Sequence, residues 1–139
     1  MNEELFGQEH VKRYRETDGE EGHDWRGTQT LLLTTTGRKS GEKRTTPLIY
    51  GQTDNDVMVV ASNGGGDAPG WYRNIDKDPQ VDVQIWGEKF AARARVATAE
   101  EKPEMWRRMT DHWPAYGEYQ ERADREIPVV ILERVKPTI

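Results

Sequence analysis

Residues 81–96 alternate apolar and polar side chains with a period of two, and this pattern restricts the fold more than any other stretch of the chain. Val81, Val83 and Ile85 share one face of the segment, and the alternation resumes at residues 90–96. Successive side chains of a strand point to opposite faces of a sheet, so the pattern indicates two half-buried strands. Gly87-Glu88, with glycine first in a two-residue loop, predicts a type II′ turn. The segment is therefore predicted to be an antiparallel β-hairpin.

The other segments predict more strands, with helices packed on the sheet. We expect strands at 30–36, 45–50, 57–61 and 127–132, and helices at 3–18, 71–75 and 100–111, with a second helical stretch from Pro114. Pro47 cannot donate to a strand ladder, so strand 45–50 is interrupted there or lies at a sheet edge. The short connections favour a mainly β fold of about six mostly antiparallel strands, either a small barrel or a strongly curved sheet.

The length and composition fit one folded domain over residues 1–139, of which 1–27 form the N-terminal helix and its lead-in. The chain has no cysteine, which excludes disulfides and thiolate metal sites. Neither a secretory signal nor an apolar run of about 20 residues is present, so we expect a cytoplasmic protein. The acidic balance, with a pI of about 5.3, argues against nonspecific nucleic-acid binding.

Residues 36–45, called the basic turn below, concentrate positive charge. Four cations occupy seven positions around two glycines, on a chain whose formal net charge is −5. Cations, a hydroxyl and backbone N–H groups together suit a phosphate or another polyanion. The glycine and lysine spacing does not match a P-loop, and a strand follows where a P-loop would open a helix. The alternative is a solvated hairpin whose cations protect an edge strand.

Two other segments suggest a ligand site. The run Gly64-Gly65-Gly66 would let the backbone approach a flat ligand closely, although such runs are often only flexible. Trp113, Tyr116 and Tyr119 either pack in the core or line the mouth of a site.

The sequence contains no conventional catalytic set. His10, His23 and His112 lack the spacing of metal ligands, so no metal site is predicted. A cysteine nucleophile and a GxSxG motif are both absent. If the protein is an enzyme, its chemistry therefore belongs to a bound organic cofactor.

Several segments, in chain order, resemble the deazaflavin-dependent nitroreductase family, whose members use coenzyme F420. They are residues 31–41, 44–50, 61–65, 71–74, 78–81, 113–119 and 124–128. The resemblance runs from about Val11 to Glu133, and the first two segments are the most specific. It implies a split β-barrel like that of FMN-binding reductases.

The resemblance also implies roles for individual residues. The phosphodiester and acidic tail of the cofactor would be held by Arg38, Lys39, Ser40 and Arg44. The deazaflavin ring would be lined by Thr45, Thr46, Pro47, Leu48 and Ile49, and covered by Val60, Ala61, Ser62 and Asn63, with Trp71, Tyr72 and Asn74 nearby. The acceptor would lie against Trp113, Tyr116 and Tyr119, and Tyr116, Tyr119 and Ser62 would be closest to the chemistry.

The implied function is hydride transfer from reduced F420 to a quinone-like or nitroaromatic acceptor. The alternatives are an FMN-binding split-barrel enzyme and a deazaflavin-binding protein without turnover. A nucleic-acid module, with bases stacked on aromatic side chains, agrees poorly with the acidic pI. Asn63 stands where many relatives carry lysine and Trp113 where tyrosine is common, and both bear on acceptor choice. The sequence leaves open whether the protein forms a homodimer and whether its N-terminal helix makes a peripheral contact with a membrane.

Overall fold

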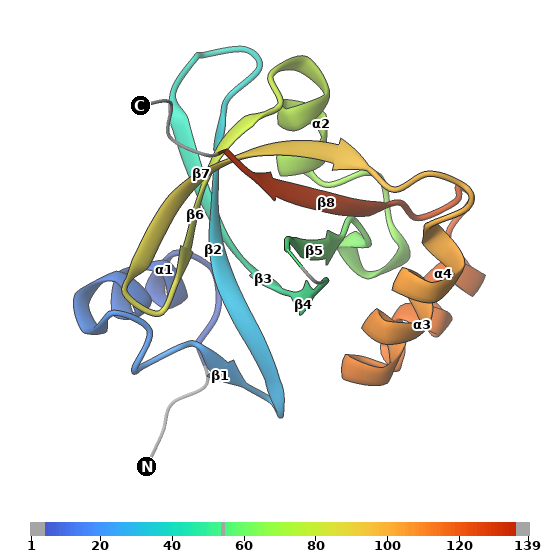
Figure 1. Cartoon of the computed structure of the whole chain (residues 1–139), viewed down its shortest axis with the longest axis horizontal. Helices are drawn as coiled ribbons and strands as arrows, with labels where there is room; N and C mark the ends of the chain where they lie inside the picture. Colours follow the sequence, from blue (N-terminus) through green and yellow to red (C-terminus); the bar gives the residue numbers. More distant parts are fainter. Residues whose placement is uncertain (1–4, 54, 136–139) are drawn as a thin grey trace.

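The computed structural model describes residues 5–53 and 55–135, whose strands form one antiparallel sheet (Figure 1). In chain order the elements are α1 (Gly7–Thr17), β1 (Asp24–Trp25), β2 (Thr28–Thr36), β3 (Lys43–Ile49), β4 (Gly51–Gln52), β5 (Val57–Val60), the 3₁₀ turn η1 (Asn63–Gly65), α2 (Gly70–Lys77), β6 (Gln80–Ile85), β7 (Glu88–Val96), α3 (Lys102–His112), α4 (Ala115–Arg122) and β8 (Val129–Arg134). The predicted mainly β fold with packed helices is confirmed.

The sheet closes on itself through a bend between β3 and β4. Leu32 of β2 pairs with Pro47 of β3 and with Gln84 of β6, so β3 and β6 lie on opposite edges of β2. From β6 the strand order continues through β7, β8 and β5 to β4. Only Tyr50 separates β3 from β4, so residues 43–52 pair first with β2 and then with β5. This connection produces the split barrel, and it leaves Pro47 in a strand that, among the described strands, pairs with β2 alone.

The hairpin β6–β7 is confirmed, but its loop differs by one residue from the prediction. Ile85 pairs with Glu88, so the loop is Trp86-Gly87, and Trp86 has the left-handed backbone with φ of 54°. Tertiary contacts hold Trp86 there. Its N–H donates to the Tyr14 hydroxyl at 2.9 Å, and its ring stacks on His23 at 3.9 Å between centroids. The predicted turn at Gly87-Glu88 was therefore wrong.

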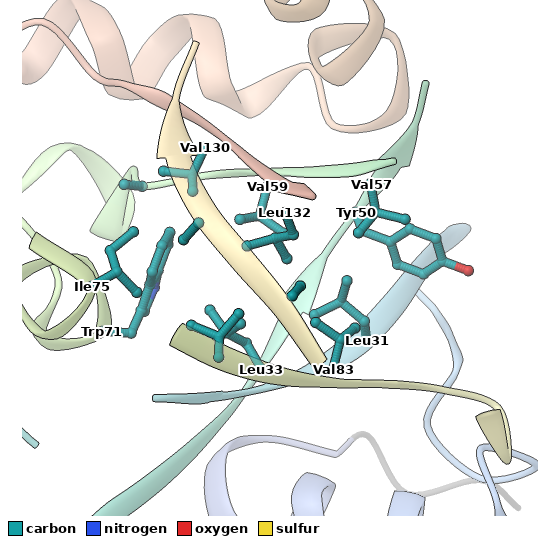
Figure 2. Close-up of a cluster of buried hydrophobic side chains, with 14 residues drawn as sticks. Leu31, Leu33, Tyr50, Val57, Val59, Trp71, Ile75, Val83, Val130 and Leu132 are labelled. Carbon is teal, nitrogen blue, oxygen red and sulfur yellow. The ribbon is translucent and has the colours of Figure 1, made fainter. Parts of the chain in front are cut away.

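Apolar side chains from the strands fill the barrel interior, as Figure 2 shows. Leu31, Leu33 and Val59 are fully buried, and Val83 lies in the same cluster. Trp71 of α2 also belongs to this cluster. Trp71 therefore anchors α2, which follows β5 in the chain, to the barrel interior.

The helix α1 packs on the outside of the sheet. Val11 and Tyr14 form a small cluster with Leu32, and the Tyr14 hydroxyl donates to the Thr30 carbonyl at 3.0 Å. Burial raises the pKa of Tyr14 to about 12. The helix was predicted from residue 3, but residues 3 and 4 lie outside the described part. Phe6, just before α1, keeps 55% of its surface exposed.

The helices α3 and α4 cover the β5–β8 side of the sheet (Figure 1). Met109 and Tyr116 bury their side chains there against Met58 and Ile131. Both helices were predicted, whereas the two-residue strands β1 and β4 were not. Among the described helices, none combines the length and the apolar character needed to cross a bilayer.

Candidate functional site

Two adjoining cavities form one groove across the mouth of the barrel. One has a volume of about 460 Å³ and mainly apolar and aromatic walls. The other, about 580 Å³, lies beside the basic turn. Thr46, Asn63, Pro69 and Trp71 line both. We call the combined space the groove, with a cationic end and an aromatic end.

The basic turn forms the cationic end. Its backbone is tight because the Gly37 N–H donates to the Glu42 carbonyl at 2.7 Å and the Gly41 N–H to the Gly37 carbonyl at 2.9 Å. Gly41 has φ of +75°, which side-chain-bearing residues rarely adopt. Arg38, Lys39, Ser40 and Arg44 line this end of the groove, and their role in holding a cofactor stays a prediction.

The side chain of Asn74 in α2 holds the basic turn in place. Its Oδ1 accepts hydrogen bonds from the Arg38 backbone N–H at 3.2 Å and from Arg38 Nη1 at 3.0 Å. Its Nδ2 donates to Thr35 Oγ1 at 3.0 Å, and Lys77 Nζ donates to the Arg38 carbonyl at 2.8 Å. Because Asn74 is only 5% exposed, the guanidinium of Arg38 is oriented before any ligand binds.

Most of the positive charge at the cationic end is not neutralised by neighbouring carboxylates. Arg44 contacts Glu42 at 3.7 Å, with both side chains largely exposed, and such pairs contribute little. Within the described ranges, no carboxylate forms an ion pair with Arg38 or Lys39. This end of the groove therefore suits an anionic group.

The middle of the groove is a mainly apolar slot. Thr46, Pro47 and Leu48 of β3 line the cavity together with Ile49, and Val60 and Ser62 contribute from the end of β5. Trp71, 7% exposed, closes the slot from α2. A slot lined by side chains without formal charge suits a flat ring system.

Trp113, Tyr116 and Tyr119, called the aromatic wall below, line the aromatic end. The Trp113 indole N–H donates to the Tyr119 hydroxyl at 3.3 Å, and the Tyr116 and Tyr119 rings meet edge to face at 6.1 Å. Burial, and to a lesser degree electrostatic interaction with Tyr119, raises the pKa of Tyr116. The Tyr116 hydroxyl therefore gives up its proton less readily than an ordinary tyrosine hydroxyl.

Several residues near the N-terminus line the aromatic end and were not predicted. Phe6, Trp25 and Arg26 all border the cavity. The Trp25 ring lies 5.8 Å from that of Trp113, and the Arg26 guanidinium lies 4.8 Å from the Trp25 ring centroid. The signal for them in the sequence is Trp25, a lone tryptophan in a polar, glycine-rich stretch.

Thr45, Ala61 and Tyr72 were expected at the ring, but they line neither cavity. Thr45 Oγ1 accepts from Arg15 Nη2 at 2.8 Å, which turns its side chain toward α1. Ala61 is fully buried. Tyr72 packs edge to face on Trp71 at 6.2 Å and supports the slot from behind.

Comparison with known proteins gives consistent matches. The sequence profile of the F420H(2)-dependent quinone reductase family matches residues 6–134. An F420H(2)-dependent quinone reductase of Mycobacterium tuberculosis (strain ATCC 25618 / H37Rv) is 35% identical over 130 residues, covering 90% of this chain and 87% of the relative.

Two solved structures are similar in both sequence and fold. One, an F420-H2 dependent reductase, is 39% identical with a TM-score of 0.70, covering 78% of this chain and 95% of its own. The other, a domain-swapped dimer, is 38% identical with a TM-score of 0.73, covering 91% of this chain and 96% of its own. The profile match includes every strand and helix that lines the groove.

Proposed function

The chain belongs to the F420H(2)-dependent quinone reductase family, and on that premise we propose that it transfers a hydride from reduced coenzyme F420 to a quinone-like acceptor. The observation that carries the proposal is the groove, which joins a cationic end to an uncharged slot and an aromatic wall. An anionic tail, a flat ring and a planar acceptor would each meet a matching surface.

The residues at the cationic end fit the chemistry of the cofactor tail, which carries a phosphate and several carboxylates. Arg38, Lys39, Ser40 and Arg44 would hold it. Charge-assisted hydrogen bonds contribute about 1.5–3 kcal/mol each, so three or four of them allow micromolar binding despite the acidic protein. An FMN tail carries one phosphate and would use only part of this cluster, which favours the longer cofactor.

The slot would place the ring beside the acceptor. Pro47 and Leu48 would support one side of the ring, and Val60, Ser62 and Asn63 would cover it. When bound, the reduced deazaflavin supplies a hydride rather than single electrons. The protein therefore mainly orients the ring and acceptor and excludes water.

The aromatic wall would supply the proton that accompanies the hydride. The Tyr119 hydroxyl already accepts a hydrogen bond from Trp113, so its own proton can be donated to an acceptor oxygen. A quinone that gains one hydride and one proton becomes a hydroquinone, and water can return the proton to Tyr119. Tyr116 would pack beside the acceptor.

Assembly and location are proposed separately from the chemistry. One solved relative is a domain-swapped dimer. We propose that this chain also forms a homodimer, which light scattering of the purified protein would test. The cytoplasmic location and a peripheral membrane contact through the N-terminal segment stay predictions. Reduction of nitroaromatic compounds also stays a prediction, and the acceptor panel described below tests it.

The proposal is tested by titrating the purified protein with oxidised deazaflavin, followed by turnover with reduced deazaflavin and a panel of quinones and nitroaromatics. We expect micromolar binding and quinone-dependent oxidation. Arg38→Glu and Lys39→Glu should abolish binding, whereas Lys89→Glu, an exposed lysine that lines a different cavity, should not. Binding without turnover would indicate a carrier. Binding of FMN with no affinity for deazaflavin would refute the proposal.

A further inference from the structure

Arg125, between α4 and β8, donates to the backbone carbonyls of the loop that follows β5. Its Nη2 contacts the Ala61 carbonyl at 2.9 Å and the Ser62 carbonyl at 3.3 Å, and its Nε contacts the Gly66 carbonyl at 3.2 Å. We call residues 61–66 the glycine loop. One guanidinium thus fixes three carbonyls within six residues, although Arg125 lines neither cavity of the groove.

These bonds determine where the amide groups of the glycine loop point. In a trans peptide the C=O and the following N–H point in opposite directions. Because the carbonyls of Ala61 and Ser62 are directed at Arg125, the N–H groups of Ser62 and Asn63 point away from it. Ser62 and Asn63 both line the groove. Neither of these two N–H groups has an acceptor within the described ranges.

The glycine loop is also fixed against α4, which carries Tyr116 and Tyr119. Gly65 has φ of +91°, and a Cβ at this position would lie 2.8 Å from the Tyr119 carbonyl oxygen. The Gly65 N–H donates to the Ser62 carbonyl at 2.9 Å. The loop is therefore held both by Arg125 and by its close approach to the backbone of α4.

Arg125 brings positive charge as well as hydrogen bonds. Within residues 5–53 and 55–135, no carboxylate pairs with it, and its Nη1 is buried without a hydrogen-bond partner. A guanidinium kept partly out of water and bonded to two carbonyls polarises those peptide units. Their N–H groups become better donors to an electron-rich atom.

We propose that Arg125 is a positioning residue that presents the Ser62 and Asn63 N–H groups as a donor pair to a carbonyl or oxyanion oxygen of a planar ligand in the groove. This inference rests on the proposed function, and the oxygen could belong to the deazaflavin ring or to the acceptor. Donors fixed in advance favour an oxygen that gains negative charge during hydride transfer.

The test compares Arg125→Met, Arg125→Lys and the control Arg107→Met, which removes an exposed arginine of α3 that pairs with Glu104. Circular dichroism first establishes folding. Hydrogen exchange of residues 61–66 then reports loop order, fluorescence titration gives the Kd of oxidised deazaflavin, and single-turnover mixing gives the hydride-transfer rate and the acceptor KM.

We expect Arg125→Met to speed exchange in the glycine loop and to weaken cofactor binding or slow hydride transfer by about tenfold or more. Arg125→Lys, which keeps the charge, should recover part of the loss, and Arg107→Met should behave as wild type. A change in Kd assigns the donor pair to the ring, and a change in rate or acceptor KM alone assigns it to the acceptor. If Arg125→Met does not fold, Arg125→Lys must show the same defects in smaller degree.

Unchanged Kd, rate and KM in a folded Arg125→Met or Arg125→Lys protein would overturn the inference and leave the proposed function intact. If the wild-type protein itself binds no deazaflavin, the proposed function fails instead.

Discussion

Replacing Asn74 with alanine removes the side chain that ties the basic turn to α2. The side chain of Asn74 takes part in three hydrogen bonds, two with Arg38 and one with Thr35. The charge of Arg38 is kept, so the substitution separates the orientation of the guanidinium from its electrostatic attraction.

The loss of stability expected for Asn74→Ala can be worked out from these contacts. The bond to Thr35 leaves behind a hydroxyl in a residue that is 1% exposed, and an unsatisfied buried group costs about 1–3 kcal/mol. The bonds to Arg38 add about 1 kcal/mol, because the arginine can regain water. We therefore expect the free energy of unfolding to fall by about 3 kcal/mol and Tm by roughly 10 °C.

The assay is a fluorescence titration of oxidised deazaflavin, run at several salt concentrations well below the new Tm. Asn74→Ala should raise Kd about tenfold with the salt dependence preserved, whereas Arg38→Met should raise Kd and reduce the salt dependence. Gln84→Ala, which loses one bond to the Trp86 carbonyl on a face outside the groove, should lower stability without changing Kd. A wild-type Kd in Asn74→Ala would refute the claim that Arg38 is oriented in advance.

Three further predictions concern the glycine loop and the pH dependence of stability. Gly65→Ala places a Cβ 2.8 Å from the Tyr119 carbonyl and should lower stability by about 1–3 kcal/mol and slow quinone turnover. Gly117→Ala in α4, where nothing lies within 4 Å of the added Cβ, should raise Tm slightly, and equal effects of the two would contradict the reasoning. Because burial raises the pKa of Tyr14 from 10.0 to about 12, the unfolded chain loses this proton first. Urea denaturation should therefore show stability falling as pH rises from about 10 to about 12, and less steeply in Tyr14→Phe. Hydrogen bonds from Arg95 hold the pKa of Glu101 at about 2, below its ordinary 4.5, so the carboxylate stabilises the fold above pH 4.5 and loses this effect as pH falls toward 2. Calorimetry of Glu101→Gln should give a lower Tm at pH 7 and a flatter acid response, and an unchanged acid response would contradict it.

The sequence predicted the parts of the fold that depend on local periodicity. The alternation at 81–96 located β6 and β7, and apolar residues on one helix face indicated α1 and α3. The two-residue strands β1 and β4 carry no periodicity of their own. They exist because Trp25 and Gly51 are held by β2 and β5.

The errors share a physical cause, since each residue is placed by a contact distant in sequence. Trp86 adopts the left-handed backbone because Tyr14 and His23 hold it. Thr45 turns from the groove toward Arg15. Trp25 lies at the aromatic end, where its ring is 5.8 Å from that of Trp113, 88 residues further along the chain. The cationic end was predictable because its cations are adjacent in the chain, whereas the dependence of Arg38 on Asn74 spans 36 residues.

A crystal structure of the protein soaked with oxidised coenzyme F420 tests the central claim most directly. The account predicts the phosphate and carboxylates of the tail against Arg38, Lys39 and Arg44, with the ring against Pro47. Density for the cofactor on another surface, with the groove empty, would contradict it.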